Sequence, residues 1–225
     1  MMAEAHPDAA TAFLALGSNL GDRLGFLREA RGRLLGSPLI GAGEVMSAPV
    51  YCTAPVDCPP GSDDFFNTVI AVPFGGDPLA LLRLARETEA ALGRPAERSR
   101  NAPRPIDVDL LAVGEIALDH PELQLPHPRL HQRRFVLQPL AEIAPDLVLP
   151  GREESAAELL AALDSAEPPS SLSPAMVNPS DPAPAPRLRL RLRLAPPSRR
   201  PSTPRRRRTK PLPSAPAKAC GSSPA

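Results

Sequence analysis

The spacing of apolar residues along this chain changes repeatedly between the period of a strand and the period of a helix. An apolar run over residues 11–16 ends in a turn-rich hexapeptide, and residues 22–35 then place leucines near one helical face. Two more strands are predicted at residues 39–51 and 65–74, on either side of a loop at 52–64 that contains prolines and a glycine. The first third of the chain is therefore predicted to run strand, helix, strand, strand.

The second part of the pattern begins with a helix whose two ends are marked in the sequence. Asp77 is expected to cap it, Pro78 takes the first helical position, and Gly93 follows its end. Further on, Ser155 and Glu158 fit the capping box of another helix. The later elements are predicted as strands at 104–111 and 116–118 and helices at 135–143 and 155–163, with Pro139 making the start of the 135–143 helix irregular.

This order of elements predicts an α+β fold. Strand–helix, strand–strand and helix–strand units in succession are typical of a ferredoxin-like antiparallel sheet with helices packed on one face. The hairpin joins the second and third strands, and the last two helices are additions behind this unit. The sequence shows no internal repeat.

Composition divides the chain of 225 residues into unequal parts. Residues 1–165 carry 14 basic and 23 acidic side chains, whereas residues 166–225 carry 12 basic and 2 acidic ones together with 15 of the 32 prolines. A segment so poor in large apolar residues cannot offset the entropy lost on folding. We therefore predict a disordered N-terminus at 1–10, one folded domain at 11–165, and a disordered Pro- and Arg-rich tail at 166–225.

Cysteine usage and hydropathy indicate in which cellular compartment the protein is expected. The three cysteines are odd in number and show no Cys-x-x-Cys spacing, so neither a disulfide framework nor a zinc ribbon is predicted. No apolar run reaches the length of a membrane span, and the start of the chain lacks the basic end and apolar core of a signal peptide. We expect a cytoplasmic protein without a membrane partner.

The strongest candidate for chemistry is the predicted strand at 104–111. Side chains alternate between faces along a strand, so Ile106, Val108 and Leu110 can enter a core while Asp107 and Asp109 project together from the other face. Paired carboxylates repel each other unless a cation lies between them, and they suit Mg²⁺. The simpler and commoner interpretation of an Asp-x-Asp pair is the polar face of a half-exposed strand.

Neighbouring segments offer further candidates, each with a plain structural alternative. Arg94, Arg98 and Arg100 lie in a polar segment before this strand, where they either bind an anion or solvate a loop. Asn67 beside aromatic residues either reads the edge of a flat heterocycle or is a satisfied polar residue. The glycines at 17–22 favour a simple turn: the Gly-Lys of a phosphate-binding P-loop is missing, and no lysine precedes Lys210.

Four separated segments coincide with one family pattern. They are FLALGSNLGD at 13–22, YCTAPV at 51–56 with DFFNTV at 64–69, RPIDVDLL at 104–111, and LPHPR at 125–129 continuing to RRF at 133–135. Together they resemble the 6-hydroxymethyl-7,8-dihydropterin pyrophosphokinases of folate biosynthesis. The resemblance covers about residues 11–163, in order and with compatible spacing.

The resemblance implies a ferredoxin-like fold and an ATP-dependent enzyme that transfers pyrophosphate from ATP to the hydroxymethyl oxygen of the reduced pterin and releases AMP. By position, Asp107 and Asp109 are implied to bind two Mg²⁺ ions, and Arg94 and Arg104 are implied to be catalytic with them. The residues implied to bind the pterin are Thr53, Val56, Phe65, Asn67 and Phe135. Those implied to bind ATP are Arg94, Arg100, Arg104, Leu110, His127 and Arg133.

Some positions depart from the family pattern. Asn101 and Ala102 stand where many members have Trp-Gly, and Ala96 stands where a second loop arginine is common. The alternative function is therefore a non-catalytic pterin- and ATP-binding relative whose basic tail binds anionic partners. The tail interleaves no aromatic residues, so no specific nucleic-acid partner is predicted. Small molecules are the expected partners of a monomeric chain, and Glu89 is expected either to orient the arginine loop or to be an exposed helix carboxylate.

Overall fold

A computed structural model describes residues 10–56, 58–94, 103–163 and 171–172 of the chain. These residues all belong to one unit, Met1–Leu190. In chain order the elements are β1 (Ala10–Ser18), α1 (Arg23–Leu35), β2 (Met46–Ser47), β3 (Tyr51–Thr53), β4 (Phe65–Phe74), α2 (Pro78–Ala91), β5 (Asp107–Val113), β6 (Leu118–His120), β7 (Leu123–Leu125), the 3-10 helix η1 (Leu130–Gln132), α3 (Arg134–Ile143), α4 (Ala156–Ala162) and β8 (Ser171–Leu172).

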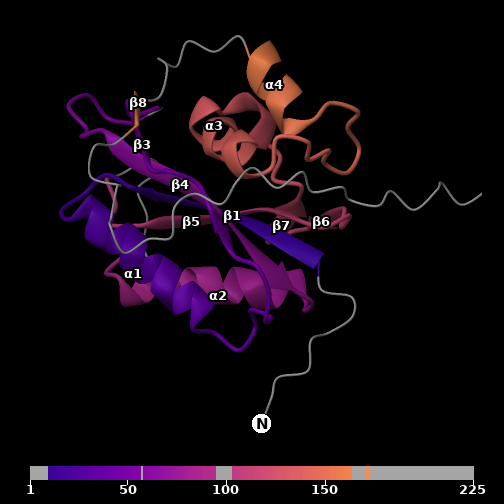
Figure 1. The fold of residues 1–225 in the computed structure, drawn as a ribbon. Helices are drawn as coiled ribbons and strands as arrows, with labels where there is room; N and C mark the ends of the chain where they lie inside the picture. The colour runs from indigo at the N-terminus through magenta and orange to yellow at the C-terminus, as the bar shows by residue number, and fades with distance from the viewer. Residues whose placement is uncertain (1–9, 57, 95–102, 164–170, 173–225) are drawn as a thin grey trace, which may run out of the picture. The chain divides into compact units, whose positions relative to one another are not determined.

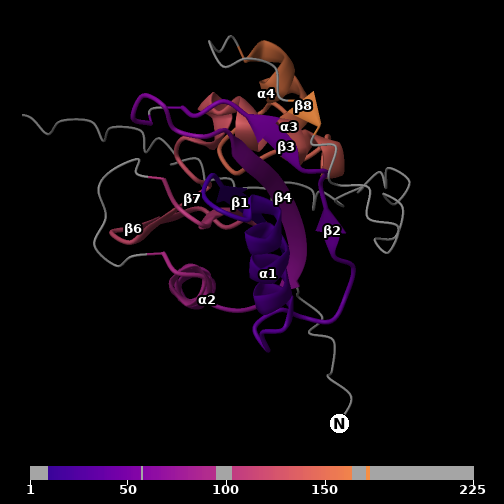
Figure 2. The same cartoon turned by 90° about the vertical axis from the view of Figure 1, so that its left-hand side faces the viewer.

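The sheet is antiparallel and has β1 near its centre. Its strands follow the order β5-β1-β4-β3-β8, and β2 pairs with β4 beside β3. β6 and β7 form a separate hairpin. Figure 2 shows this hairpin beside α2, to which an ion pair of 2.6 Å between Arg86 and Glu122 connects it. An antiparallel sheet with helices agrees with the predicted α+β class.

Helices cover both faces of the sheet, as Figure 1 shows. One core lies between the sheet and α1 with α2, and includes Leu14, Leu27 and Leu81. The other lies between the sheet and α3 with α4, and includes Phe13, Leu137 and Leu159. The prediction of helices on one face is therefore wrong for the whole domain. Apolar side chains of β1 project from both faces of the sheet, so each face must be covered by helices to exclude water.

The predicted helix signals are confirmed. The Asp77 side chain accepts a hydrogen bond of 3.0 Å from the Leu79 N–H, with Pro78 in the first turn. Gly93 follows the helix with φ +87°, a conformation that glycine adopts without steric cost. At α4, the reciprocal capping box between Ser155 and Glu158 is present.

Three element predictions need correction. The strand expected over 39–51 is reduced to β2 and β3, because glycines and Pro49 interrupt the ladder. The short return strand expected at 116–118 lies two residues later, at β6, where it pairs with β7. α3 runs unbroken through the buried Pro139, since a proline there removes only one hydrogen bond while the helix packs on the core.

A short strand also occurs within the stretch predicted to be disordered. β8 pairs with β3 through Leu172 opposite Tyr51 and Ser171 opposite Cys52. This pairing needs backbone groups only, so the low apolar content of the tail does not reveal it. The prediction of disorder is wrong at Ser171 and Leu172, and also at Ala10, which belongs to β1. The other residues of the two segments, 1–9, 166–170 and 173–225, lie outside the described residues.

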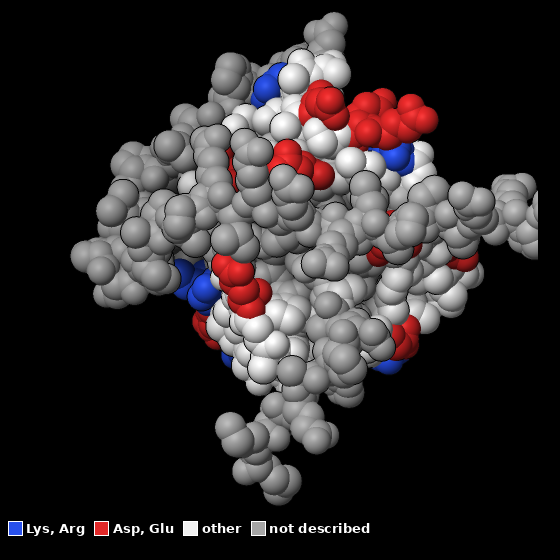
Figure 3. Space-filling model, turned by 45° about the vertical axis from the view of Figure 1, so that its right-hand side comes forward, with Lys and Arg blue, Asp and Glu red and all other residues white. Residues whose placement is uncertain are grey.

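Charges on the described surface are mixed. On the face drawn in Figure 3, acidic side chains cover more of the described surface than basic ones, in agreement with the acidic balance of residues 1–165. Within the described segments, no helix combines the length and apolar character needed to cross a membrane.

Candidate active site

The two predicted carboxylates lie on one face of β5. Ile106, Val108 and Leu110 enter the core shared with α1 and α2, so Asp107 and Asp109 project toward the α3 side of the sheet. Their side chains are 21% and 38% exposed, which leaves both carboxylates reachable by a ligand. The predicted strand geometry is confirmed, and its polar face is a half-buried cluster.

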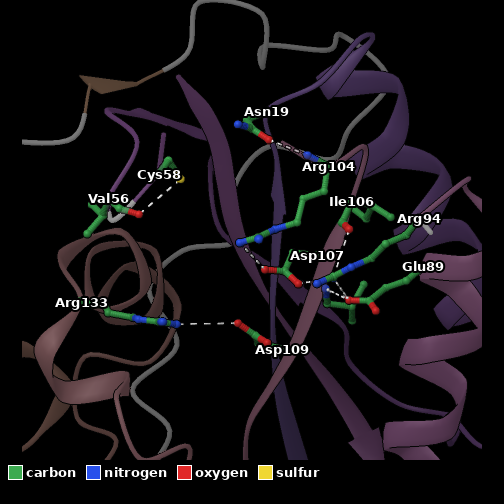
Figure 4. A network of polar contacts seen from close by, with 11 residues as sticks. Asn19, Val56, Cys58, Glu89, Arg94, Arg104, Ile106, Asp107, Asp109 and Arg133 are labelled. Carbon is green, nitrogen blue, oxygen red and sulfur yellow. Dashed lines mark hydrogen bonds and ion pairs between the residues drawn. The ribbon is translucent and has the colours of Figure 1, made fainter. Parts of the chain in front are cut away.

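Arg94 is held between two carboxylates, those of Glu89 and Asp107 (Figure 4). It also donates a hydrogen bond of 3.3 Å to the Ile106 carbonyl, and its side chain is only 9% exposed. Glu89 is buried on α2 and accepts a further hydrogen bond of 2.8 Å from the Val108 N–H. Glu89 is therefore no exposed helix carboxylate: it fixes the first arginine of the predicted loop behind the carboxylate pair.

Arg104 connects the carboxylate cluster to an aromatic ring. Its guanidinium lies 3.0 Å from Asp107 Oδ2 and 5.7 Å from the centroid of the Phe65 ring. Asn19 makes two hydrogen bonds to the backbone of this arginine. Its side-chain Oδ1 accepts from the Arg104 N–H at 2.9 Å, and its backbone N–H donates to the Arg104 carbonyl at 3.3 Å. The turn after β1 thus positions the start of β5.

The two carboxylates differ in their electrostatics. Burial raises the pKa of Asp107, but the guanidinium groups of Arg104 and Arg94 outweigh it and hold the pKa below its ordinary value. Burial and the charge of Asp107 raise the pKa of Asp109 to about 6, and Arg133 offsets this only in part. Asp107 is therefore a stabilised anion, whereas the negative charge of Asp109 is poorly balanced.

Arg133 and His127 lie on the α3 side of this cluster. Arg133 Nη1 is 3.9 Å from Asp109 Oδ2, and its guanidinium lies 5.4 Å from the centroid of the Phe135 ring. The His127 N–H donates a hydrogen bond of 2.8 Å to the carbonyl of Leu111, which fixes the residue beside β5. Segments far apart in the sequence therefore converge on the carboxylate pair.

His127 differs from the arginines in its charge. Burial, together with the charges of Arg133 and Arg129, lowers the pKa of this imidazole to about 4. The ring is consequently neutral near pH 7. In this environment His127 therefore offers phosphate a hydrogen-bonding group, whereas the arginines offer positive charge.

Three of the residues expected around a flat ring, Thr53, Phe65 and Asn67, come together on β3 and β4. Thr53 pairs with Phe65 across β3 and β4, and Asn67 Nδ2 donates a hydrogen bond of 2.7 Å to Thr53 Oγ1. Phe65 is buried, and Phe135 is half-buried at the start of α3. Val56 lies apart on the exposed loop after β3, where its carbonyl accepts from the Cys58 thiol at 3.4 Å.

Two residues expected to bind ATP, Leu110 and Arg100, have no described side chain at the carboxylate cluster. The Leu110 side chain is buried on the opposite face of β5, so only its backbone could meet a ligand. Val108 turns its N–H outward to Glu89, and strand alternation turns the backbone groups of Leu110 to the same outer edge. Arg100 lies outside the described residues, as do Ala96 and Asn101.

Sequence reasoning missed the part played by Asn19. It treated the turn at 17–22 as a matter of glycines, yet Asn19 is buried and bound on both sides to Arg104. The available signal was an amide directly after an apolar strand, because a buried amide must find hydrogen-bond partners.

The carboxylate pair has the donor chemistry for a divalent cation. Its oxygen ligands are hard, and the raised pKa of Asp109 reflects negative charge that a bound cation would balance. In the described part of the chain, no group of three or more His, Cys, Asp or Glu side chains is arranged to hold a metal ion. Mg²⁺ would therefore need further oxygen ligands from phosphate or water.

Comparison with curated proteins places these residues in a known family. The family described as 7,8-dihydro-6-hydroxymethylpterin-pyrophosphokinase (HPPK) matches residues 13–145. A protein of Methylorubrum extorquens named 2-amino-4-hydroxy-6-hydroxymethyldihydropteridine pyrophosphokinase is 42% identical over 153 residues, 68% of this chain and 93% of its own length. A protein of the same name from Pseudomonas aeruginosa is 38% identical over 154 residues, 67% of this chain and 90% of its own.

Solved structures agree at the level of the fold. An HPPK-DHPS in complex with substrates superposes with a TM-score of 0.53 at 15% identity, covering 68% of this chain and 43% of its own. Plasmodium falciparum HPPK-DHPS A437G/K540E with pterin and p-hydroxybenzoate gives a TM-score of 0.52 at 15% identity, covering 69% and 44%. The chain spans less than half the length of these two structures. On the match to the family and the identity to its curated members, the chain belongs to the HPPK family.

Proposed function

We propose that this chain transfers the pyrophosphoryl group of ATP to the hydroxymethyl oxygen of 6-hydroxymethyl-7,8-dihydropterin, giving the pterin diphosphate and AMP for folate biosynthesis. Membership of the HPPK family and the names of its curated relatives support this reaction. The observation that carries it in this chain is the position of Arg104 between the Asp107 carboxylate and the Phe65 ring. One guanidinium thereby joins a phosphate site to a site for a flat ring.

Asp107 and Asp109 are proposed to hold two Mg²⁺ ions together with oxygens of the ATP phosphates. When bound, these ions neutralise the charge that develops on the transferring group. The carboxylates are ready for this role at neutral pH, because Asp107 is a stabilised anion and Asp109 loses its proton near pH 6. Metal binding in turn favours the charged form of Asp109.

The arginines are proposed to hold the phosphates in line with the acceptor. Arg104 and Arg133 have partly exposed side chains, 23% and 21%, and both lie against an aromatic ring and an aspartate. Arg94 is bound to Glu89 and Asp107 in the structure, so its first task is to orient Asp107. His127, Arg100 and the backbone of Leu110 complete the proposed ATP site.

The pterin is proposed to stack between Phe65 and Phe135, with its polar edge on Asn67. Thr53 fixes the amide of Asn67, so a ring with a mismatched edge would leave that buried amide unpaired. The exposed Val56 would cover the ring from the loop after β3. Positioning and electrostatics suffice for the transfer, and no covalent nucleophile is required.

Further parts of the proposal concern the architecture. The order β1-α1-β3-β4-α2-β5 and the strand order β5-β1-β4-β3 support a ferredoxin-like domain at 11–165 between short N-terminal and long C-terminal extensions. We propose that the protein is a monomer. ATP as substrate favours the cytoplasm.

The test is an assay of AMP formation from ATP. We expect AMP only when both the hydroxymethyl-dihydropterin and Mg²⁺ are present, and we expect Asp107→Ala and Asp109→Ala to remove most of it. Glu87→Gln, on the exposed side of α2, is the matched control and should retain activity. AMP formation without the pterin would contradict the proposal, and tight binding of both substrates without product would identify a non-catalytic relative.

A further inference from the structure

Gly17 lies in β1 at a position where the backbone conformation does not require glycine. It lies in the regular pairing of β1 with β4 and β5, and it is absent from the described glycines with positive φ. Glycine in such a strand weakens it, because it loses the most chain entropy on folding and has no side chain to pack. The reason for glycine must therefore lie in the space beside it.

That space is filled by the amide of Asn67. A Cβ atom on residue 17 would stand 2.7 Å from Asn67 Oδ1 and 3.9 Å from Cδ1 of the Phe65 ring. The amide cannot turn away freely, because Asn67 is buried and its Nδ2 donates the 2.7 Å hydrogen bond to Thr53 Oγ1. A methyl group at this position would therefore either turn the amide away from Thr53 or push the side chain off the strand.

Residue 17 also lies between the two halves of the proposed site. In the sheet register it is opposite Asn67 on β4 and opposite Asp107 on β5. Phe13, four residues earlier on β1, packs in the core with α3, and strand alternation places residue 17 on this same face. A side chain at residue 17 would therefore meet the Asn67 amide on the face of the sheet that carries the proposed site.

We propose that Gly17 is a positioning residue for pterin recognition, which rests on the proposed function. Its missing side chain lets the Asn67 amide lie flat against β1 with Oδ1 and Nδ2 in fixed orientation. Gly17 thus acts through Asn67 and makes no bond to the substrate itself.

The test is a double-mutant cycle between Gly17→Ala and Asn67→Ala. We expect Gly17→Ala to raise the dissociation constant and the KM for the pterin about tenfold or more, the effect of misdirecting one buried hydrogen bond. The affinity for a non-transferable ATP analogue with Mg²⁺ should stay unchanged. In the Asn67→Ala background, which lacks the oxygen that the methyl meets, Gly17→Ala should add no further loss.

Gly32→Ala is the matched control, because a Cβ at this helical glycine meets nothing within 4 Å. It should bind both ligands like the wild type. If Gly17→Ala alone unfolds, the double variant decides: a melting temperature equal to that of Asn67→Ala supports the proposal, and one as low as the single variant overturns it.

Two outcomes separate this inference from the proposed function. An active wild type whose pterin affinity is unchanged by Gly17→Ala overturns the role of Gly17 alone. A wild type that neither binds the pterin nor forms AMP overturns the function and this role with it.

Discussion

The same substitution at the two carboxylates should change stability in opposite directions. Asp107 makes ion pairs with Arg94 and, at 3.0 Å, with Arg104. Among the described residues, Asp109 has one long ion pair, of 3.9 Å to Arg133, and it faces the charge of Asp107. Asp107→Asn therefore removes attraction, whereas Asp109→Asn removes repulsion, and the two amides have the same size and polarity.

The magnitudes follow from burial. Asp107 is 21% exposed, and its replacement by Asn leaves the nearly buried Arg94 with one carboxylate fewer. We therefore expect a loss of stability of about 2–3 kcal/mol, below the ~3–5 kcal/mol for a fully buried pair. Asp109 is 38% exposed, and solvent screens its repulsion, so the gain should not exceed about 1 kcal/mol. For a domain of this size, Asp107→Asn should lower the melting temperature by about 5–10 °C, and Asp109→Asn should raise it by about 2–4 °C.

The assay is thermal unfolding of the metal-free proteins at neutral pH, followed by circular dichroism. A parallel assay of AMP formation with Mg²⁺ should show both variants reduced by about 100-fold or more, since each loses a metal ligand. The reasoning would be refuted if Asp107→Asn melted at or above the wild type. An equal fall of both melting temperatures would refute it as well.

Four further predictions follow from the same cluster and from the tail. Glu89→Gln should lower stability by about 3–5 kcal/mol in chemical denaturation, because Arg94 loses a charge partner and the two side chains of this pair are only 9% and 6% exposed. The exposed Glu87→Gln should change it by less than about 0.5 kcal/mol, and equal effects would contradict the burial argument. At low Mg²⁺ concentration, activity should fall as the pH drops through about 6, where Asp109 takes up a proton, and saturating Mg²⁺ should move this midpoint to lower pH; a midpoint independent of Mg²⁺ would exclude Asp109. In the metal-free protein the same raised pKa adds stability as the pH falls from about 6 toward the ordinary value of 3.8, which pH-dependent unfolding can measure. Removal of residues 173–225, which retains β8, should leave kcat and KM unchanged within about twofold, because the assigned site lies in 53–135; a sharp loss would give the tail a function.

The sequence predicted those elements whose signals are local. Caps such as Asp77 and Ser155 and the alternation around Asp107 depend on neighbours along the chain, and the structure confirms them. The strand at 39–51 failed because apolar content does not reveal where glycine and proline break a ladder. β8 escaped notice because backbone pairing leaves no mark on composition.

For the site, strand alternation predicted the carboxylate pair and the family resemblance implied the rings, whereas the environment of the supporting residues stayed open. The buried state of Glu89 depends on where Arg94 and the Val108 N–H lie after folding, and helical periodicity alone leaves that carboxylate on either face. The neutral state of His127 likewise arises from tertiary burial and from two arginines placed around it. Such environments are set by contacts between segments, which residue identity does not disclose.

The Glu89 carboxylate has one more consequence, which concerns association between copies of the chain. β5 is an outer strand, and an outer strand can template a strand of another molecule. Here the Val108 N–H donates a hydrogen bond to Glu89, and the Leu111 carbonyl accepts one from the His127 N–H, each at 2.8 Å. At the opposite end of the sheet, β8 pairs with β3. The residues that build the site thus also guard the sheet against edge-to-edge aggregation, and loss of Glu89 should make the protein prone to concentration-dependent self-association.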